Sequence, residues 1–188
     1  MNVINTPLAG VFVVEPKIFF DKRGRFFESY NEDRYKAAGI DVVFVQDNIS
    51  YSTEGVLRGL HYQLRFPQGK LVSVLEGSVF DVAVDIRVGS PTFGQWFGCE
   101  LSAENGKQLY VSPGFAHGFC VTSETVCFHY KCTDYYHPED ECGVAWNDAD
   151  IGITWSLQLS PILSPKDEKY VSLKETPIEQ LPQHGQSC

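Results

Sequence analysis

The sequence lacks the features that mark membrane-spanning and secreted proteins. No apolar run approaches the roughly 18 residues that a transmembrane helix requires. The first ten residues, MNVINTPLAG, contain no basic segment followed by a long apolar stretch, so we expect no secretory signal peptide. We therefore expect the protein to act in the cytoplasm and to make no contact with a membrane.

Positive charge is also scarce, with 15 Lys and Arg against 24 Asp and Glu and a net charge of -9. A field of this sign repels nucleic acid, so we expect no nucleic-acid partner. An anionic ligand would need a local group of cations. Arg23, Arg58 and Lys70 stand among glycines and aromatic residues. Cations in this setting are more typical of a site for a phosphate-bearing ligand than of a solvated surface where they pair with acids.

Cysteine spacing argues against both zinc and disulfides. The six cysteines form no C-x-x-C pair, so we expect reduced thiols and no structural zinc site. The segment PGFAHGF, around His117, is similar to part of a metal-binding small barrel. Such barrels carry a His-x-His motif where this sequence reads His61-Tyr62-Gln63. With too few nitrogen and oxygen ligands at suitable spacing, we expect no metal.

What the sequence does contain is β-structure. Apolar residues alternate along SVFDVAVDIRV, where positions 80, 82, 84 and 86 are apolar and the opposite face carries Asp81 and Asp85. The simplest interpretation places these two acids on a solvated outer face, and the alternative is a paired or functional role inside a barrel. The segments 70–76 and 78–85 predict a hairpin with its turn at 76–78.

Further strand-like segments occur at 10–16, 41–50, 93–101, 107–113, 114–123 and 125–136. Many short strands separated by turn signals predict a single mainly β domain over residues 1–188, built as a sandwich or barrel. Helix is expected only at 31–40, capped by Asn31 and ended by Gly39, and in SPKDEKY after Ser164. We expect the polar end of the tail, from 177, to be loosely held.

The segment GVLRGLHYQ contains the histidine of greatest interest. In a regular strand, Arg58 and His61 would point to opposite faces. Gly59 lies between them and could mark a β-bulge that brings both side chains into one site. A lone strand histidine is more often a packed core residue than a catalytic one, so the rest of the sequence must decide.

Several segments, taken in order, resemble the dTDP-4-dehydrorhamnose 3,5-epimerases. They are DKRGRFFESYN, FVQDNIS, GVLRGLHYQ, QGKLV, GSVFDVAVDIR, SPTFGQW, LSAEN, PGFAHGF, YKCTDYYHPEDE and WNDADIGITW. The similarity covers roughly residues 1–170, and the tail at 171–188 is left unassigned. It implies a cupin-like jelly roll, or double-stranded β-helix, that works without metal or cofactor. The implied reaction inverts C3 and C5 of dTDP-4-dehydro-6-deoxy-D-glucose and gives dTDP-4-dehydro-L-rhamnose, which serves polysaccharide biosynthesis.

The same resemblance implies roles for individual residues. His61 matches the base, Asp167 its carboxylate partner, Tyr130 the acid on the opposite face and Lys70 the enolate stabiliser. The implied substrate-binding residues are Arg23, Glu28, Gln46, Asp47, Asn48, Arg58, His117, Glu141 and Lys166. Family members are homodimers whose N-terminal segment crosses over, so Arg23 and Glu28 are expected to serve the partner's site. Phe26 or Tyr135 is the candidate for packing on thymine, and strand parity suggests that Asp81 orients His117.

Three other functions stay open at the level of sequence. The first is a sister activity on the same scaffold, either epimerisation at C3 alone or ketoisomerisation. The second is a metal-dependent cupin enzyme, which the missing His-x-His motif disfavours. The third is a sugar-binding cupin without catalysis, which would need no base at His61.

Overall fold

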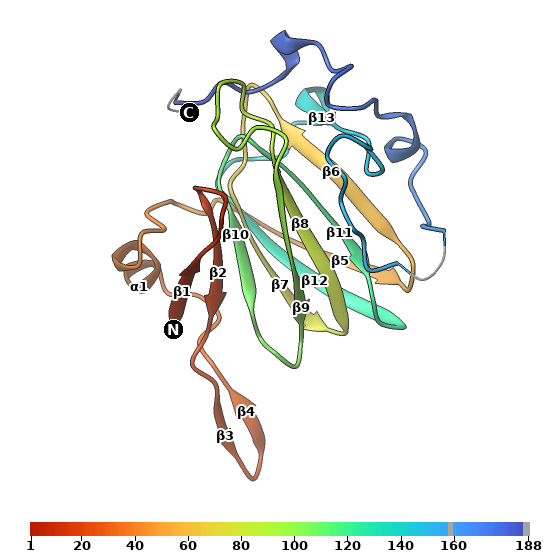
Figure 1. Cartoon of the computed structure of the whole chain (residues 1–188). Helices are drawn as coiled ribbons and strands as arrows, with labels where there is room; N and C mark the ends of the chain where they lie inside the picture. Colours follow the sequence, from red (N-terminus) through yellow and green to blue (C-terminus); the bar gives the residue numbers. More distant parts are fainter. Residues whose placement is uncertain (158–159, 186–188) are drawn as a thin grey trace.

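The computed structural model describes residues 1–157 and 160–185, and its strands form two facing antiparallel sheets and a separate two-stranded hairpin of β3, Phe19–Asp21, and β4, Gly24–Phe26 (Figure 1). The six-stranded sheet has the order β1-β2-β10-β7-β12-β5, with strands Asn2–Asn5, Val11–Glu15, Gln108–Val111, Lys70–Glu76, Thr125–Cys132 and Gln46–Thr53. The five-stranded sheet has the order β13-β6-β11-β8-β9, with strands Glu141–Gly143, Leu57–Gln63, Phe115–Val121, Ser78–Asp85 and Trp96–Ser102. Non-consecutive neighbours in both sheets confirm the mainly β, jelly-roll prediction.

Three apolar clusters hold these layers together. The main core fills the space between the sheets, with Val72, Leu109 and Phe128 from one sheet and Val79 and Phe119 from the other. A second cluster lies on the outer face of the five-stranded sheet and is covered by the C-terminal third of the chain. A third lies between the helix α1, Glu32–Ala37, and the outer face of the six-stranded sheet. The five-stranded sheet is therefore covered on both faces, whereas the outer face of the six-stranded sheet is covered only in part, since Ile49, Tyr51 and Leu75 on it are exposed.

The predicted hairpin at 70–85 is wrong, because β7 and β8 belong to different sheets. β7 pairs with β10 and β12, whereas β8 pairs with β9 and β11. Gly77 lies between them with φ +77, and a Cβ there would collide with the Thr125 carbonyl and the Ser123 hydroxyl. A turn is present at Gly77, but it connects a strand of one sheet to a strand of the other. Both strands bury apolar residues in the core between the sheets.

The solvated interpretation of Asp81 and Asp85 is also wrong. Both side chains are fully buried, because the face of β8 that carries them looks into the space between the sheets. Phe80, Val82 and Val84 on the opposite face pack under the C-terminal cover. The predicted period-two alternation is therefore present, but both faces of this strand are buried except at Ser78 and Phe80, which are partly exposed.

The helical predictions are largely confirmed. The Asn31 side chain accepts a hydrogen bond from the Arg34 amide and caps α1, and Gly39 follows the helix with φ +95. The second segment is a 3-10 turn, η2, Asp167–Lys169, with the Ser164 hydroxyl accepting from the Asp167 amide at 3.2 Å. No helix in the described part of the chain is long and apolar enough to cross a membrane.

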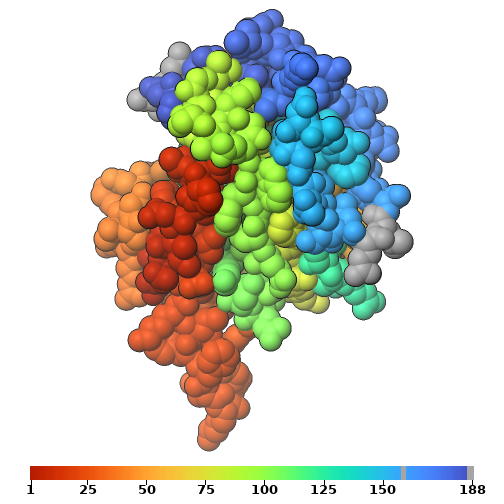
Figure 2. Space-filling model, viewed as in Figure 1, coloured from red at the N-terminus to blue at the C-terminus, as the bar shows by residue number. Residues whose placement is uncertain are grey.

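The C-terminal segment from 171 to 185 is packed onto the body, contrary to the expectation of a loose tail. Leu173 and Leu181 are buried in the second cluster, and a further 3-10 turn, η3, spans Ile178–Gln180. The Val88 amide donates to the Pro182 carbonyl at 2.8 Å. In Figure 2 this blue segment covers one end of the molecule, while the orange hairpin of residues 19–26 projects from the other. The last three residues, 186–188, lie outside the described part.

Candidate active site

A cavity of about 280 Å³ opens between the two sheets. Side chains from both sheets and from three loops line it: Gln46, Asn48, Arg58, His61, Tyr62, Gln63, Gln68, Lys70, Tyr130, Tyr136, Glu141 and Lys166. An inner recess of about 60 Å³ continues toward the core, where it meets His117, Phe119 and Phe128. The lining is predominantly polar and carries both charges, as expected for a site that holds a charged, hydroxylated ligand.

A β-bulge in β6 brings Arg58 and His61 to the same cavity. His117 on β11 pairs with His61, but Phe119 pairs with Arg58. Moving two residues along β11 therefore corresponds to moving three residues along β6. Gly59 makes this possible because its φ is +132 and it packs closely against Gly118. A Cβ on residue 59 would lie 2.6 Å from the Cα of Gly118. The bulge that the sequence offered as one alternative is therefore present.

His61 is held by a buried carboxylate. Its Nε2 lies 2.6 Å from Oδ1 of Asp167, whose side chain is 3% exposed. Burial alone would raise the pKa of Asp167, but the hydrogen bond and charge of His61 outweigh it and lower that pKa. A carboxylate at Nε2 fixes the proton there, which leaves Nδ1 as the free ring nitrogen. The Tyr170 ring packs edge-on against the imidazole and limits its rotation.

Lys70 and Tyr130 enter the cavity from the opposite sheet. Burial lowers the pKa of the Lys70 ammonium, whereas Glu141 and Asp81 act in the opposite sense. Burial raises the pKa of the Tyr130 hydroxyl. The tyrosine therefore stays protonated at neutral pH and can donate a proton. His61 and Tyr130 line the same cavity from β6 and β12, so an imidazole and a phenol enter it from different sheets.

Glu141 joins the mouth of the cavity to His61. Its Oε1 lies 2.6 Å from the Lys166 ammonium and 3.9 Å from Nδ1 of His61, and its Oε2 accepts from the Tyr136 hydroxyl at 2.6 Å. Although burial opposes it, these donors lower the pKa of Glu141. Tyr136 was missed at the level of sequence, where the neighbouring Tyr135 was favoured. Both belong to one irregular segment, in which strand parity does not predict orientation.

A second histidine and aspartate pair lies deeper in the same site. Nε2 of His117 is 2.8 Å from Oδ1 of Asp81, as the parity of β8 and β11 suggested. The other oxygen of Asp81 is buried and has no hydrogen-bond partner among the described residues. His117 lines the inner recess, beside Lys70 and Tyr130. The pair forms the polar wall behind the cavity.

The remaining predicted residues are divided between the cavity and other parts of the molecule. Gln46 and Asn48 line the cavity, but Asp47 points to the outer face of the sheet and bonds Lys131 at 2.8 Å. Glu28 contacts Arg34 at 3.1 Å beside α1. Arg23 and Phe26 lie on the projecting hairpin of β3, Phe19–Asp21, and β4, Gly24–Phe26. The Arg23 side chain is 84% exposed, so neither hairpin residue meets the cavity of its own chain.

Two further sequence expectations concern metals and thiols. Within residues 1–157 and 160–185, no cluster of three or more His, Cys, Asp or Glu is arranged to hold a metal ion. The five described cysteines, at 99, 120, 127, 132 and 142, are free thiols. Cys188 lies outside the described residues.

Comparison with known proteins places this geometry in a family. A sequence model described as dTDP-4-dehydrorhamnose 3,5-epimerase matches residues 5–175. A protein of that name from Escherichia coli is 51% identical over 93% of this chain and 96% of its own length. Another from Neisseria gonorrhoeae is 54% identical over 89% of this chain, which spans only 51% of that longer relative.

A solved structure shows the same architecture. The dTDP-6-deoxy-D-glucose-3,5-epimerase of Legionella pneumophila, determined in complex with dTDP-4-keto-L-rhamnose, is 53% identical. It superimposes with a TM-score of 0.95 over 99% of both chains. By sequence, fold and the extent of the match, this chain belongs to the dTDP-4-dehydrorhamnose 3,5-epimerase family.

Proposed function

We propose that the protein epimerises dTDP-4-dehydro-6-deoxy-D-glucose at C3 and C5 to give dTDP-4-dehydro-L-rhamnose, without metal or cofactor. The observation that carries this proposal is the arrangement of His61, held by Asp167, opposite Tyr130 across a cavity that also contains Lys70. Family membership supports the substrate and reaction class. The free thiols are consistent with the further proposal that it acts in the cytoplasm.

Each epimerisation requires a base, an acid and a group that stabilises negative charge. The C4 ketone of the sugar acidifies the hydrogens at C3 and C5. Nδ1 of His61 removes one of them, and the electron pair of the broken C–H bond moves to the C4 oxygen as an enolate. The Lys70 ammonium stabilises that oxygen, and Asp167 stabilises the imidazolium. A proton then returns to carbon from the opposite face, supplied at C5 by the Tyr130 hydroxyl.

The cavity also offers groups for the nucleotide. Arg58 and Lys166 are cations at its rim, suited to a diphosphate, and Gln46 and Asn48 provide amides. Tyr136, about half exposed, presents an aromatic ring at the same rim. Tyr135 lies outside the cavity, so Tyr136 is the better candidate from this chain for contact with the base. Phe26 lies on the projecting hairpin and could contact a base only in the cavity of a partner chain.

Incubation with substrate in D2O tests the reaction itself. We expect deuterium at both C3 and C5 of the product, because each centre is deprotonated and reprotonated from solvent-exchanging groups. Proton NMR of the product reads both positions. Label at C3 alone would instead identify a 3-epimerase on the same fold, and isomerised product with the ketone at C3 would identify a ketoisomerase.

Substitution of the acid and the base tests their separate roles. We expect His61→Ala to reduce turnover at both centres by about 10² or more, the usual scale for a general base. Tyr130→Phe should impair incorporation at C5 more than exchange at C3, because the Tyr130 hydroxyl is assigned to reprotonation at C5. Deuterium incorporation at each carbon against time measures this. Equal losses at C3 and C5 in the tyrosine variant would contradict its assignment to C5.

We further propose a homodimer in which the N-terminal hairpin crosses to the partner. Phe20 and Phe26 are exposed by 75% and 72% on this projecting hairpin, and Arg23 lies at its tip. Exposed aromatics of this kind are typical of an interaction surface. Crossing would bring Arg23 and Glu28 to the partner's cavity, where they would add a cation and a carboxylate.

Mixed dimers test the crossing. Arg23→Ala and His61→Ala each damage one component of the site. If Arg23 serves the partner, unfolding and refolding the two variants together restores one intact site in every mixed dimer. We expect about a quarter of the wild-type activity under random mixing, well above either variant alone. Activity no greater than the average of the separate variants would show that Arg23 acts in its own chain or outside the site.

A further inference from the structure

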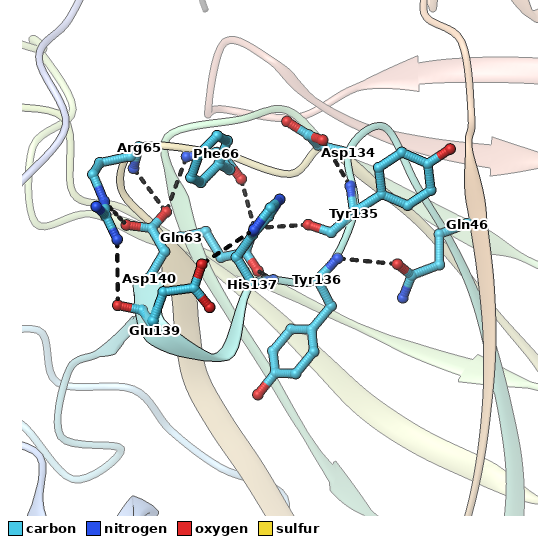
Figure 3. A network of polar contacts seen from close by, with 10 residues as sticks. All are labelled: Gln46, Gln63, Arg65, Phe66, Asp134, Tyr135, Tyr136, His137, Glu139 and Asp140. Atoms are coloured by element: carbon cyan, nitrogen blue, oxygen red, sulfur yellow. Dashed lines mark hydrogen bonds and ion pairs between the residues drawn. The ribbon is translucent and has the colours of Figure 1, made fainter.

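The segment from Thr133 to Asp140 forms one rim of the cavity, and buried side chains hold it in place. It connects β12 to β13 and contains a single short 3-10 turn, η1, Pro138–Asp140. Figure 3 shows that the Gln63 and Gln46 side chains bond its backbone, and that Asp140, within the segment, bonds Arg65 and Phe66. A segment with so little regular structure depends on such bonds for its position.

Gln63 makes the central contacts. Its side chain is 5% exposed, and its amide nitrogen donates to the Tyr135 carbonyl at 3.1 Å and to the Phe66 carbonyl at 2.6 Å. Its amide oxygen accepts from the His137 backbone N–H at 2.8 Å. Of the neutral side chains, only Asn and Gln combine two donors with a carbonyl acceptor, and Gln63 uses both functions here. It therefore holds the backbone on either side of Tyr136.

Asp140 fixes the far end of the same segment. Its buried carboxylate accepts from the backbone N–H groups of Arg65 and Phe66, at 2.8 and 2.9 Å, and from the Arg65 side chain at 2.9 Å. The Phe66 and His137 rings stack at 4.0 Å between the two anchors. The rim is thus attached to the end of β6 by Gln63 and to the chain that follows β6 by Asp140.

The anchored residue between them reaches the reacting groups. The Tyr136 backbone N–H donates to the Gln46 side chain at 3.0 Å, and its hydroxyl donates to Glu141. Glu141 in turn lies 3.9 Å from Nδ1 of His61. Gln63 follows His61 by two residues on β6, so one strand carries both the imidazole and the amide that holds the rim.

We propose that Gln63 is a positioning residue that fixes the 133–140 rim, and through it Tyr136, in the binding-competent arrangement. This rests on the proposed function for the identity of the ligand, a dTDP-sugar whose nucleotide portion contacts the rim. Gln63 acts on affinity rather than on proton transfer, because its bonds go to backbone groups of the rim and of Phe66, and none goes to His61, Lys70 or Tyr130. Strand β6 thereby links the nucleotide end of the site to the base.

Gln63→Met tests this, since methionine keeps the length of the side chain but neither donates nor accepts strong hydrogen bonds. We expect KM for the nucleotide sugar and Kd for dTDP, measured by calorimetry, to rise about tenfold. A tenfold change corresponds to the net free energy of about one hydrogen bond that no longer holds the rim in place. The value of kcat should change less than threefold. Amide hydrogen exchange in the peptide covering 133–140 should accelerate, while exchange in β8 and β11 stays at the wild-type rate.

Two further variants separate positioning from direct contact and from general destabilisation. Asp140 does not line the cavity, so Asp140→Asn can affect dTDP binding only through the position of the rim. We expect it to raise Kd for dTDP and to accelerate exchange in the same peptide. Asp148→Asn is the matched control, because Asp148 is equally buried and accepts three backbone N–H groups, from Asp150, Ile151 and Leu173, in a loop outside the cavity lining. It should lower thermal stability and leave KM and Kd unchanged.

Gln63→Glu supplies a further comparison, and Asp140→Asn covers the case in which the Gln63 variants do not fold. At neutral pH the carboxylate of Gln63→Glu keeps an acceptor for the His137 N–H but turns its second oxygen toward the Tyr135 and Phe66 carbonyls, so its Kd should rise at least as much as that of Gln63→Met. Unchanged exchange at 133–140 in a folded Gln63 variant, or unchanged Kd in Asp140→Asn, would overturn the proposal. If the wild-type protein binds dTDP but fails the D2O test, the proposed reaction is wrong and the positioning claim is still judged by Kd and exchange.

Discussion

Buried aspartates are the residues that most clearly connect sequence, stability and site. Asp81, Asp85, Asp140, Asp148 and Asp167 are all buried, and each accepts hydrogen bonds from named donors. An unpartnered carboxylate in such a position would cost several kcal/mol, so these donors are essential to the fold. Two of the five hold histidines that line the site, and the other three hold backbone or loop structure.

Asp85 provides a prediction about stability and pH. Burial alone would raise its pKa, but bonds from Arg87, Ser90 and Thr92 lower it to about 2, below the usual value of 3.8. A lowered pKa stabilises the folded state above about pH 4, and this contribution is lost as the pH falls toward 2. Asp85→Asn should therefore lower the free energy of unfolding by about 2 kcal/mol at neutral pH.

Urea denaturation at about pH 7 and about pH 3 measures this effect. The difference between wild type and variant should shrink at the lower pH, because the wild-type carboxylate begins to lose its advantage there. A difference of the same size at both values would mean that hydrogen-bond geometry, rather than charge, accounts for the loss.

At the scale of the element, strand β6 contributes more residues to the cavity lining than any other strand. Its bulge at Gly59 turns Arg58 and His61 into one cavity, its end carries Gln63, and its partner β13 brings Glu141. A regular strand would have divided these side chains between the cavity and the second apolar cluster. The irregular backbone is therefore part of the site and not a defect of the sheet.

Gly59→Ala should damage both stability and activity. A Cβ at this position meets the backbone of Gly118 and His117, and φ +132 is a conformation that alanine rarely adopts. We expect a loss of about 3 kcal/mol or more in the free energy of unfolding, together with reduced turnover at saturating substrate. Gly55→Ala is the control, because Gly55 also has a positive φ but no described atom lies within 4 Å of the point that a Cβ would occupy. A similar loss in both variants would show that backbone strain alone is responsible.

At the scale of the molecule, the C-terminal segment covers the sheet that carries the site. It places Leu173 and Leu181 on the outer face of that sheet, and the Gln180 carbonyl accepts from the Tyr62 hydroxyl at 2.9 Å. Asp167 and Tyr170 lie just before this cover and contact His61. Residues more than a hundred positions after the base therefore support it from behind.

Leu181→Ala should lower the free energy of unfolding by about 2 to 4 kcal/mol, the range for a buried leucine. Ile178→Ala is the matched control on the same segment, because Ile178 is 63% exposed and should change stability by less than about 0.5 kcal/mol. Chemical denaturation of the two variants side by side gives both values. A Leu181 variant as stable as the Ile178 variant would mean that the cover contributes little to the folded body.

Much of the fold and part of the site follow from local pattern. Alternation along 79–86 predicts a strand, Asn31 and Gly39 bound a helix, and the short motifs around His61, His117 and Tyr130 carry the family resemblance. These features depend on a few neighbouring residues, so they can be read without knowing where the chain goes next. The placement of Asp167 near His61 came from that resemblance and not from the pattern of residues 58–63.

The tertiary structure alone decided which surfaces meet. It separated β7 from β8, buried Asp85, packed the C-terminal segment, and turned Tyr136 rather than Tyr135 toward the cavity. Each outcome depends on contacts between residues far apart in the chain, whose burial and hydrogen bonding outweigh the local preference. By itself the sequence determined the kinds of element and the chemistry available, while packing between distant segments decided where that chemistry lies.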